Sequence, residues 1–500
     1  MGGISGSVPP SSPSSPSLFT LFGDRAVLQR DQSIPLWGRA GPGAQVSVRF
    51  RDRAAETRAD NEGRWRVCLA PLPACADPAD IEVASGGETT ISRDVVVGDV
   101  WLASGQSNME FTVKGARDAA KEMAAADFPH IRHIKVGQAV ATAPVREISS
   151  TGWESAAPGT VGEFTAVGYF FARKIHAQVG VPVGILHSSW GGTPIESWMS
   201  DKARSSTSLA GALKARWRQA MLDWPPERVA RYPQDMAIWQ KEEDRAKASG
   251  EKNLLPWPQP PATRDSPMFP GGLFNAMIAP LQPCGLRGVL WYQGESNVER
   301  SEEYAELFKA MIRDWRAGWR QDELPFYFVQ IANYLQQQDS TNRCWARLRE
   351  AQTAALALPA TGMAVSVDVG QADDVHPVNK QDVGHRLAVL ALAGAHGVEV
   401  DCHGPEFAGA GREGGGFRVR FSHAGSGLTA LGGGVKSLEL AGADKVFHPA
   451  IGRIEGESLL VSLPEVPEPV AVRYAWTNAP EANLYNGAGL PAVPFRSDDW

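Results

Sequence analysis

Four stretches of this sequence combine glycine with the residue types that activate and stabilise an acyl group. They are residues 104–109, 188–193, 293–297 and 373–377. A serine hydroxyl becomes an effective nucleophile when a neighbouring base takes its proton, and a carboxylate can orient that base. Serine, histidine and aspartate all occur in these stretches, so they predict acyl transfer through a serine.

The candidate nucleophile is Ser107 and the candidate base is His376. Asp373 lies three residues before this histidine and Asp374 two residues before it. The longer spacing lets a turn bring an oxygen back to the imidazole, so we favour Asp373 as the orienting acid and keep Asp374 as the alternative acid. Both aspartates can instead cap a helix that begins near Asn379.

An oxyanion formed during acyl transfer needs hydrogen-bond donors. The candidates are the backbone N–H groups of Ser107 and Gly192 and the side-chain amide of Gln293. The structural alternative for Gln293 is a loop residue that holds Trp291 and Asn297 in place. Four further polar or aromatic residues of these stretches are predicted to bind substrate: Asn108, Trp190, Glu295 and Asn297.

Each of these residues has an ordinary structural explanation when it is taken alone. A serine in a turn is often a cap, and a histidine beside proline is often a surface residue. Their joint occurrence after four separate predicted strands is what favours catalysis. Other histidines, including His130, His133 and His403, lack such a setting and are expected to be structural.

The elements that must position these residues alternate between strand and helix. Apolar runs predict strands at residues 95–103, 183–187, 289–292, 326–331 and 363–367. Helical spacing predicts helices that follow or precede them, the last over about residues 379–393. Such alternation indicates a mostly parallel sheet with helices on both faces, and ligands bind beyond the carboxyl ends of such strands.

The 500-residue chain exceeds the roughly 250–300 residues of a single core, so several domains are expected. Residues 1–17 form a Ser/Pro-rich leader that is predicted to be disordered, and residues 18–95 alternate like a small β-sandwich. Residues 96–400 hold the α/β alternation, and residues 401–500 return to short strands. An insertion at about residues 201–265 is equally consistent with a lid and with a solvated helical excursion.

Composition excludes several classes of protein. The net charge of −7 and the lack of long Lys/Arg runs argue against a nucleic-acid partner. No apolar stretch approaches the roughly 20 residues that cross a membrane. The sequence has no phosphate loop and no zinc-ligand spacing, so neither a metal nor another cofactor is expected. Cys68 and Cys75 are close enough for a local disulfide, and unpaired thiols are as probable.

At its candidate site the sequence resembles the sialate O-acetylesterase family of the SGNH hydrolase superfamily. The resemblance extends from about Leu18 to Trp500. The matching stretches are residues 27–30, 98–109, 190–193, 291–297, 374–377, 483–486 and 494–496. The long match at residues 98–109 is the most specific of them.

This resemblance implies a flavodoxin-like SGNH domain with β accessory domains, no metal, and a C-terminal tail that returns to the hydrolase domain. It assigns the nucleophile to Ser107, the base to His376 and oxyanion donors to Gly192 and Gln293. The implied substrate is an acetylated carbohydrate, either O-acetyl sialic acid or a plant polysaccharide such as xylan or xyloglucan. A secreted or periplasmic location is expected, although no signal peptide is recognisable.

Two other classes of function remain open at this stage. One is a different serine esterase or lipase on the same scaffold, which would need an apolar acyl tunnel. The other is a glycan-binding protein without hydrolytic activity, against which the set of Ser107, Gln293 and His376 argues. The oligomeric state cannot be read from the sequence.

Overall fold

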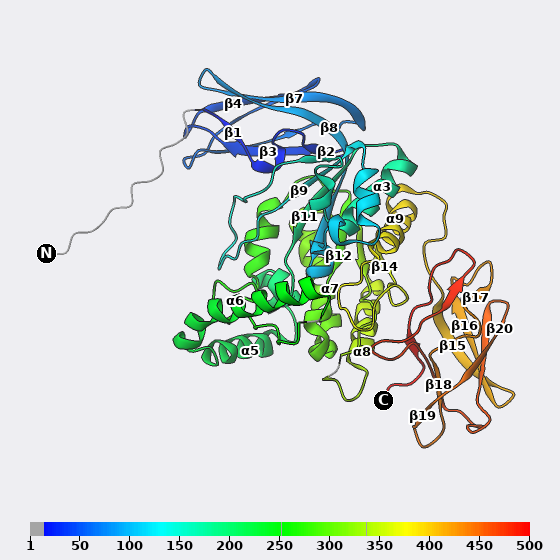
Figure 1. Cartoon of the computed structure of the whole chain (residues 1–500). Coiled ribbons are helices and arrows are strands. Elements are labelled where there is room, and N and C mark those ends of the chain that lie inside the picture. The colour runs from blue at the N-terminus through cyan, green and yellow to red at the C-terminus, as the bar shows by residue number, and fades with distance from the viewer. Residues whose placement is uncertain (1–14, 252, 337) are drawn as a thin grey trace.

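The computed structural model describes residues 15–251, 253–336 and 338–500 (Figure 1). Residues 1–14 of the leader predicted over residues 1–17 lie outside these ranges. Strand β1 (Ser17–Leu18) begins at the last residue of the predicted leader. Within the described ranges, no helix is both long enough and apolar enough to cross a membrane.

A central mixed sheet forms the body of the molecule, with strand order β10-β9-β11-β8-β12-β13-β14. All neighbouring pairs along this order are parallel except β10 with β9, which is antiparallel. The strands are β8 (Glu88–Gly105), β9 (Phe128–Lys135), β10 (Glu154–Ala156), β11 (Val183–Ser189), β12 (Gly288–Tyr292), β13 (Phe326–Val329) and β14 (Thr361–Ala364). The mostly parallel sheet is therefore confirmed, with an antiparallel edge strand added.

Helices cover both faces of this sheet. Trp101 and Ala103 of β8 belong to one buried cluster, which includes residues of α3 (Ala166–Val179) and α9 (Lys380–His396). The alternate residues of β8 face a second cluster with α7 (Ser301–Trp319) and α8 (Cys344–Thr353). A strand that is buried on both faces reads as a continuous apolar run, as residues 95–103 do.

The N-terminal strands are continuous with the central sheet through β8, which is 18 residues long. Its first half pairs with β7 and its second half with β11 and β12. The boundary predicted at residues 95/96 therefore falls inside one strand. The remaining N-terminal strands are β2 (Val27–Gln29), β3 (Ile34–Arg39), β4 (Gln45–Phe50), β5 (Arg53–Arg58), β6 (Arg64–Leu69) and β7 (Cys75–Ser85).

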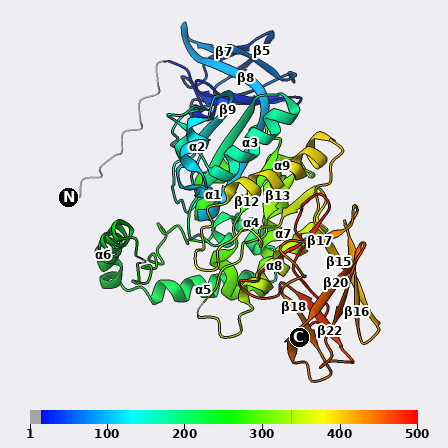
Figure 2. The same ribbon diagram turned by 45° about the vertical axis from the view of Figure 1, so that its right-hand side comes forward.

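The insertion is helical, with α4 (Asp201–Ser205), α5 (Ala210–Leu222) and α6 (Pro226–Ser249). Arg216 of α5 forms an ion pair with Glu303 of α7, which fixes α5 to the body. In contrast, α6 is exposed along most of its length and projects to one side (Figure 2). These features favour a solvated excursion over a lid.

The C-terminal segment forms antiparallel sheets of its own, with a separate apolar core (Figure 1). One has the order β15-β16-β21-β20 and another β19-β18-β22-β24, while β17 pairs with β23. The strands are β15 (Glu406–Glu413), β16 (Gly416–Ser422), β17 (Leu428–Ala430), β18 (Leu438–Ala441), β19 (Phe447–Pro449), β20 (Ile451–Glu455), β21 (Ser458–Ser462), β22 (Ala471–Tyr474), β23 (Leu484–Asn486) and β24 (Phe495–Arg496).

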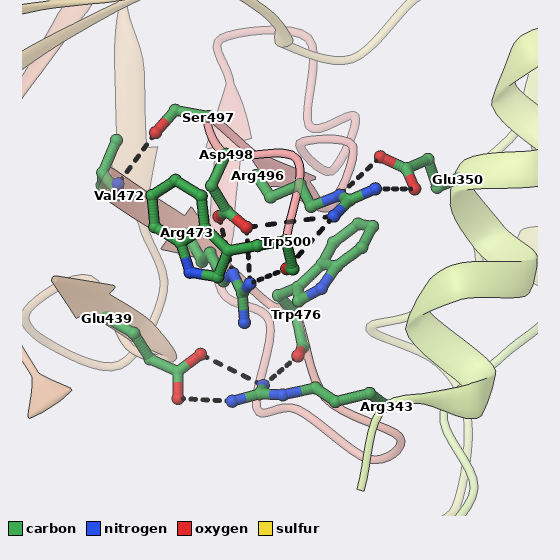
Figure 3. A network of polar contacts seen from close by, with 10 residues as sticks. All are labelled: Arg343, Glu350, Glu439, Val472, Arg473, Trp476, Arg496, Ser497, Asp498 and Trp500. Atoms are coloured by element: carbon green, nitrogen blue, oxygen red, sulfur yellow. Dashed lines mark hydrogen bonds and ion pairs between the residues drawn. The ribbon is translucent and has the colours of Figure 1, made fainter. Parts of the chain in front are cut away.

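The C-terminal tail lies against α8 of the central body (Figure 3). Arg496 donates to both carboxylate oxygens of Glu350 on this helix, at 2.9 and 3.0 Å. At the beginning of α8, Arg343 forms an ion pair with Glu439 of β18. Two charged contacts thus join the last strands to one helix of the central body.

All five cysteines are free thiols in the structure. Cys68 is exposed on β6 and Cys75 is the first residue of β7. The local disulfide that their spacing allows is not formed.

Candidate active site

Three strands of the central sheet end at one level. Gly105 at the end of β8 is in register with Ser189 of β11 and with Tyr292 of β12. Gly105 has a φ of +139°, and a Cβ at this position would lie 2.1 Å from the Tyr292 carbonyl oxygen. Only glycine therefore allows β8 to lie this close to the Tyr292 carbonyl. Because the three strands end at one level, the polar stretches that follow them meet at one edge of the sheet.

Ser107 begins a short helix, α1 (Ser107–Glu110), directly beyond this edge and is half-buried. Its Oγ lies 2.8 Å from Nε2 of His376, which belongs to the loop between β14 and α9. The two residues are 269 positions apart in the sequence. The hydroxyl can donate to a neutral imidazole at this distance, which is the geometry of an activated serine.

One carboxylate near the imidazole Nδ1 belongs to Asp374. Its Oδ1 is 4.0 Å from Nδ1 and accepts the backbone N–H of His376 at 2.8 Å. This backbone bond closes a tight turn of the kind that aspartate favours, and it turns the carboxylate towards the ring. Asp373, which the spacing in the sequence favours, lies in the same exposed turn, and the assignment of the orienting acid to Asp373 or Asp374 stays a prediction.

The surroundings of His376 keep it in the basic, neutral form. Burial lowers the pKa of His376 below its usual 6.5, and the positive charge of Lys380 lowers it further. The carboxylate of Asp374 acts in the opposite direction, but the net pKa shift is downwards. A general base must be unprotonated before the reaction, so this shift suits His376 to that task.

A second serine–histidine pair shows that distance alone does not define the site. Nε2 of His187 lies 2.6 Å from Oγ of Ser189, but both residues are fully buried. No ester could reach this hydroxyl. Of the two pairs, only the one with Ser107 faces solvent.

The loop after β11 passes beside Ser107. A Cβ on Gly191 would lie 3.3 Å from the Ser107 Cβ, and the Gly191 N–H donates to Oε2 of Glu110 at 2.8 Å. The next residue, Gly192, has a φ of +72° and open space around it. Within the described residues its N–H has no protein acceptor, so it is available to an oxyanion.

The side-chain amide of Gln293 is not available in the same way. Its nitrogen donates to the Thr193 carbonyl at 3.2 Å and to Asn297 Oδ1 at 2.8 Å, and its oxygen accepts from Tyr304 at 2.8 Å. Both of its N–H groups are thus used, and the residue is fully buried. These bonds agree with the structural alternative, a glutamine that joins two loops, and the role of Gln293 as an oxyanion donor stays a prediction.

The two asparagines predicted to bind substrate are also buried. Asn297 accepts from the Ile195 N–H at 2.9 Å and donates to Glu196 at 3.0 Å. Asn108 accepts from Lys380 and donates to Glu295 and to the backbone. Both ends of each amide are bonded within the protein, and a contact of either asparagine with substrate stays a prediction.

The other two residues predicted to bind substrate differ from each other. Trp190 is half-buried at the edge of the site, and its backbone N–H donates to the Gly105 carbonyl at 3.1 Å. It remains a candidate for substrate contact. Glu295 has one carboxylate oxygen bonded to Asn108 at 2.6 Å, and its other oxygen is buried. Burial raises the pKa of Glu295.

Three residues that the sequence analysis did not select organise the site: Gln106, Glu110 and Lys380. Gln106 Oε1 accepts the N–H groups of Gly294 and Ser296, each at 3.3 Å. Together with Asn108, these residues bind three loops to the turn that carries the serine. In the sequence, the polar residues at positions 106, 108 and 110 around Ser107 were the feature that could have indicated Gln106 and Glu110.

One group of three side chains among the described residues could share a metal ion: His403, Glu406 and His423. It belongs to the C-terminal sheets and contains none of the candidate catalytic residues. The two imidazole rings are tilted, with centroids 4.7 Å apart and planes 30° apart.

A half-exposed serine bonded to a neutral histidine, at the carboxyl edge of a parallel sheet, is the arrangement of an α/β serine hydrolase. The sequence profile described as "Carbohydrate esterase, sialic acid-specific acetylesterase" matches residues 97–237 and 247–393. The chain belongs to this family and is a carbohydrate acetylesterase. The family resemblance noted in the sequence is thereby confirmed.

Individual relatives agree with this assignment. The chain is 30% identical over 409 residues to the sialate O-acetylesterase of Mus musculus, a match that covers 74% of this chain and 72% of that protein. The human sialate O-acetylesterase is 29% identical over 409 residues, with 74% and 69% covered. The crystal structure of a carbohydrate acetylesterase from Xanthomonas citri superposes with a TM-score of 0.82 at 39% identity, with 97% of this chain and 100% of that chain covered.

Proposed function

We propose that this carbohydrate acetylesterase hydrolyses its substrate with Ser107 as the nucleophile and His376 as the general base. The observation that supports this most directly is the 2.8 Å contact between Ser107 Oγ and His376 Nε2 at the solvent-facing edge of the sheet. The fully buried pair of His187 and Ser189 offers no alternative.

In the first half of the reaction, Ser107 Oγ attacks the acetyl carbonyl carbon while His376 Nε2 takes the hydroxyl proton. The backbone N–H groups of Ser107 and Gly192 donate to the resulting oxyanion. The C–O bond to the sugar then breaks, and the protonated His376 returns its proton to the sugar oxygen. Ser107 is left as an acetyl ester.

In the second half, water attacks this acetyl ester while His376 takes a proton from the water. The tetrahedral intermediate collapses, acetate leaves, and the proton returns to Ser107 Oγ. A carboxylate just before the histidine, Asp373 or Asp374, orients the imidazole and stabilises its positive charge in both halves.

We also propose that the central body is an SGNH-type domain of flavodoxin-like topology, with β-sandwich-like accessory domains on either side. When the five strands β8, β11, β12, β13 and β14 are numbered in chain order, their order in the sheet is 2-1-3-4-5, and β9 and β10 extend the sheet beyond β11. This is the flavodoxin-like order, in which ligands bind where the strand order reverses, at the first strand. Ser107 follows that strand.

The proposed substrate is an O-acetylated glycan outside the cytoplasm, either a sialic acid or a plant polysaccharide. The relatives from mouse and human are named sialate O-acetylesterases, which supports the first. Trp190 at the edge of the site offers an aromatic face for a sugar ring of either kind.

Acetate release from acetylated sialosides, xylans and xyloglucan tests this proposal. We expect the intact protein to release acetate from at least one of them, and Ser107→Ala to lose about 10⁶-fold in turnover while staying folded. The matched control is Ser189→Ala, which removes the hydroxyl of the buried pair and should leave the mechanism intact. Equal activity in the Ser107 variant would disprove the mechanism, and faster hydrolysis of octanoate than of acetate esters would indicate a lipase.

A further inference from the structure

Asn108 connects the two halves of the catalytic pair. It follows Ser107 directly, and its Nδ2 donates to the carbonyl of Val375, the residue before His376, at 2.9 Å. The loop that carries His376 is otherwise largely exposed, with residues 371–374 and 378 at the surface. The amide of Asn108 therefore determines how closely this loop approaches the nucleophile.

Lys380 in turn holds this amide in its orientation. The Lys380 Nζ donates to Asn108 Oδ1 at 2.5 Å, and the side chain is fully buried. The ammonium lies 4.8 Å from the ring centroid of Phe111 and 5.5 Å from that of Tyr292. Because Nζ can only donate, it forces the amide oxygen towards itself and the amide nitrogen towards Val375.

The position of Lys380 is unfavourable for stability. Burial lowers the pKa of Lys380 to about 7, which reflects the cost of taking an ammonium out of water. Lys380 is also the first residue of α9, where a positive charge opposes the helix dipole. A residue that costs stability and touches the site is a candidate for a functional role.

Glu295 completes the network from the other side. Its Oε1 accepts from Asn108 Nδ2 at 2.6 Å, so the amide lies between the carboxylate of Glu295 and the ammonium of Lys380. Glu295 also belongs to the loop after β12, whose backbone Gln106 holds. Through Asn108 the loops after β8, β12 and β14 are joined at one buried point.

We propose that Lys380 is a positioning residue for ester hydrolysis, which acts through Asn108 to hold the backbone beside His376 against the backbone beside Ser107. This inference rests on the proposed function. Without the ammonium, the amide can rotate, Val375 loses its donor and the imidazole moves away from the hydroxyl. Misplacement of a reacting group by about 1 Å can cost about 100-fold in rate.

The test is the Lys380→Met variant, which keeps the length and removes the donor and charge. We expect kcat for acetate release to fall about 10- to 100-fold and KM to stay within about threefold. The melting temperature reflects two opposing effects, since the variant removes a buried cation and also leaves the buried Asn108 Oδ1 without its donor. A kcat within threefold of the unchanged protein would overturn the inference.

Two further variants separate positioning from general destabilisation. Asn379→Ala removes the cap whose Oδ1 accepts the Asp382 N–H at the same helix end, without touching Asn108. It should lower the melting temperature and keep kcat within threefold, and an equal kcat loss would overturn the inference. The double variant Asn108→Ala with Lys380→Met should be no slower than the slower single variant, whereas multiplied losses would show independent roles.

The proposed function and this inference fail in different ways. If the unchanged protein releases no acetate from any acetylated glycan or from p-nitrophenyl acetate, the proposed function is wrong. If the unchanged protein is active and Lys380→Met is equally active, only the role of Lys380 is wrong.

Discussion

At the scale of single residues, the side chains that hold the loops of the site are different from the side chains that react. Gln106, Asn108 and Glu110 each bind a different loop, and Ser107 between them keeps its hydroxyl for the imidazole. Amides with both ends bonded cannot rotate freely. Such fixed neighbours hold reacting groups within the narrow geometry that catalysis needs.

The acid that serves His376 can be identified by kinetics on two variants. The spacing in the sequence favours Asp373, so Asp373→Asn should lower kcat by about 10²- to 10⁴-fold, because the imidazole loses the anion that orients it. Asp374→Asn should cost about tenfold or less. Steady-state rates of acetate release from the two single variants and the double variant decide this. A large loss in the Asp374 variant beside an active Asp373 variant would assign the role to Asp374.

The dependence of activity on pH follows from the lowered pKa of His376. The base works only when it is neutral, so activity should persist below pH 6.5 and fall as the pH drops through the lowered pKa. The acidic limb of kcat/KM, which reports the free enzyme, should therefore have its midpoint below 6.5. A midpoint above 6.5 would mean that Asp374 outweighs burial and Lys380.

Residue types indicated the catalytic pair, but side-chain directions were not available from the sequence. Ser107 and His376 could be selected because few residue types perform their chemistry. Gln293 and Asn297 look identical in sequence whether they face an ester or each other. Lys380 could not be selected, because a buried lysine at the start of a helix is recognised only once its neighbours are known.

At the scale of elements, apolar runs predicted the central strands because these strands are buried on both faces. The predicted strand at residues 95–103 lies within β8, but its continuation into the N-terminal sheet was not foreseen. Local alternation cannot reveal that one strand is shared by two sheets. Helix α6 was also not predicted as such, since Pro233 interrupts a polar sequence that has no buried face.

The end of β8 provides a test of how an element positions the nucleophile. Gly105→Ala should lower stability and activity together, because the new Cβ meets a backbone carbonyl that cannot move independently of β12. The matched control is Gly409→Ala, where φ is +143° and no atom lies within 4 Å.

We expect Gly409→Ala to lower the free energy of unfolding by about 1–3 kcal/mol from backbone strain alone and to leave acetate release unchanged. Gly105→Ala should lose more stability than this and most of its activity. Denaturant unfolding and acetate release measure the two effects. Equal stability losses would show that the contact with Tyr292 contributes nothing beyond strain.

At the scale of the whole molecule, α8 connects the C-terminal sheets with the site. Arg349 of α8 is fully buried and donates to four backbone carbonyls, of Ile331, Ala332, Thr477 and Asn478, at 2.8–3.0 Å. One turn later, Gln352 donates to the Gln293 carbonyl at 3.0 Å. The same helix thus holds the C-terminal segment and the loop after β12.

The fully buried and the half-buried arginine at this junction should differ in their contribution to stability. Arg349→Met removes a donor from four carbonyls, of which those of Ala332 and Asn478 keep a second donor, and each group left unsatisfied costs about 1–3 kcal/mol. Even after relaxation, we expect the free energy of unfolding to fall by about 3 kcal/mol or more. Arg496→Ala breaks an ion pair with Glu350, whose side chain is 44% exposed, and should cost about 1 kcal/mol or less.

Denaturant unfolding followed by tryptophan fluorescence measures both variants on the full chain. Because Arg349 joins two sets of sheets, its loss should also split a single transition into two, with the C-terminal sheets melting first. Arg496→Ala should retain the transition of the unchanged protein. If Arg349→Met proves as stable as Arg496→Ala, the four carbonyls are satisfied by other donors, and α8 does not couple the C-terminal sheets to the site.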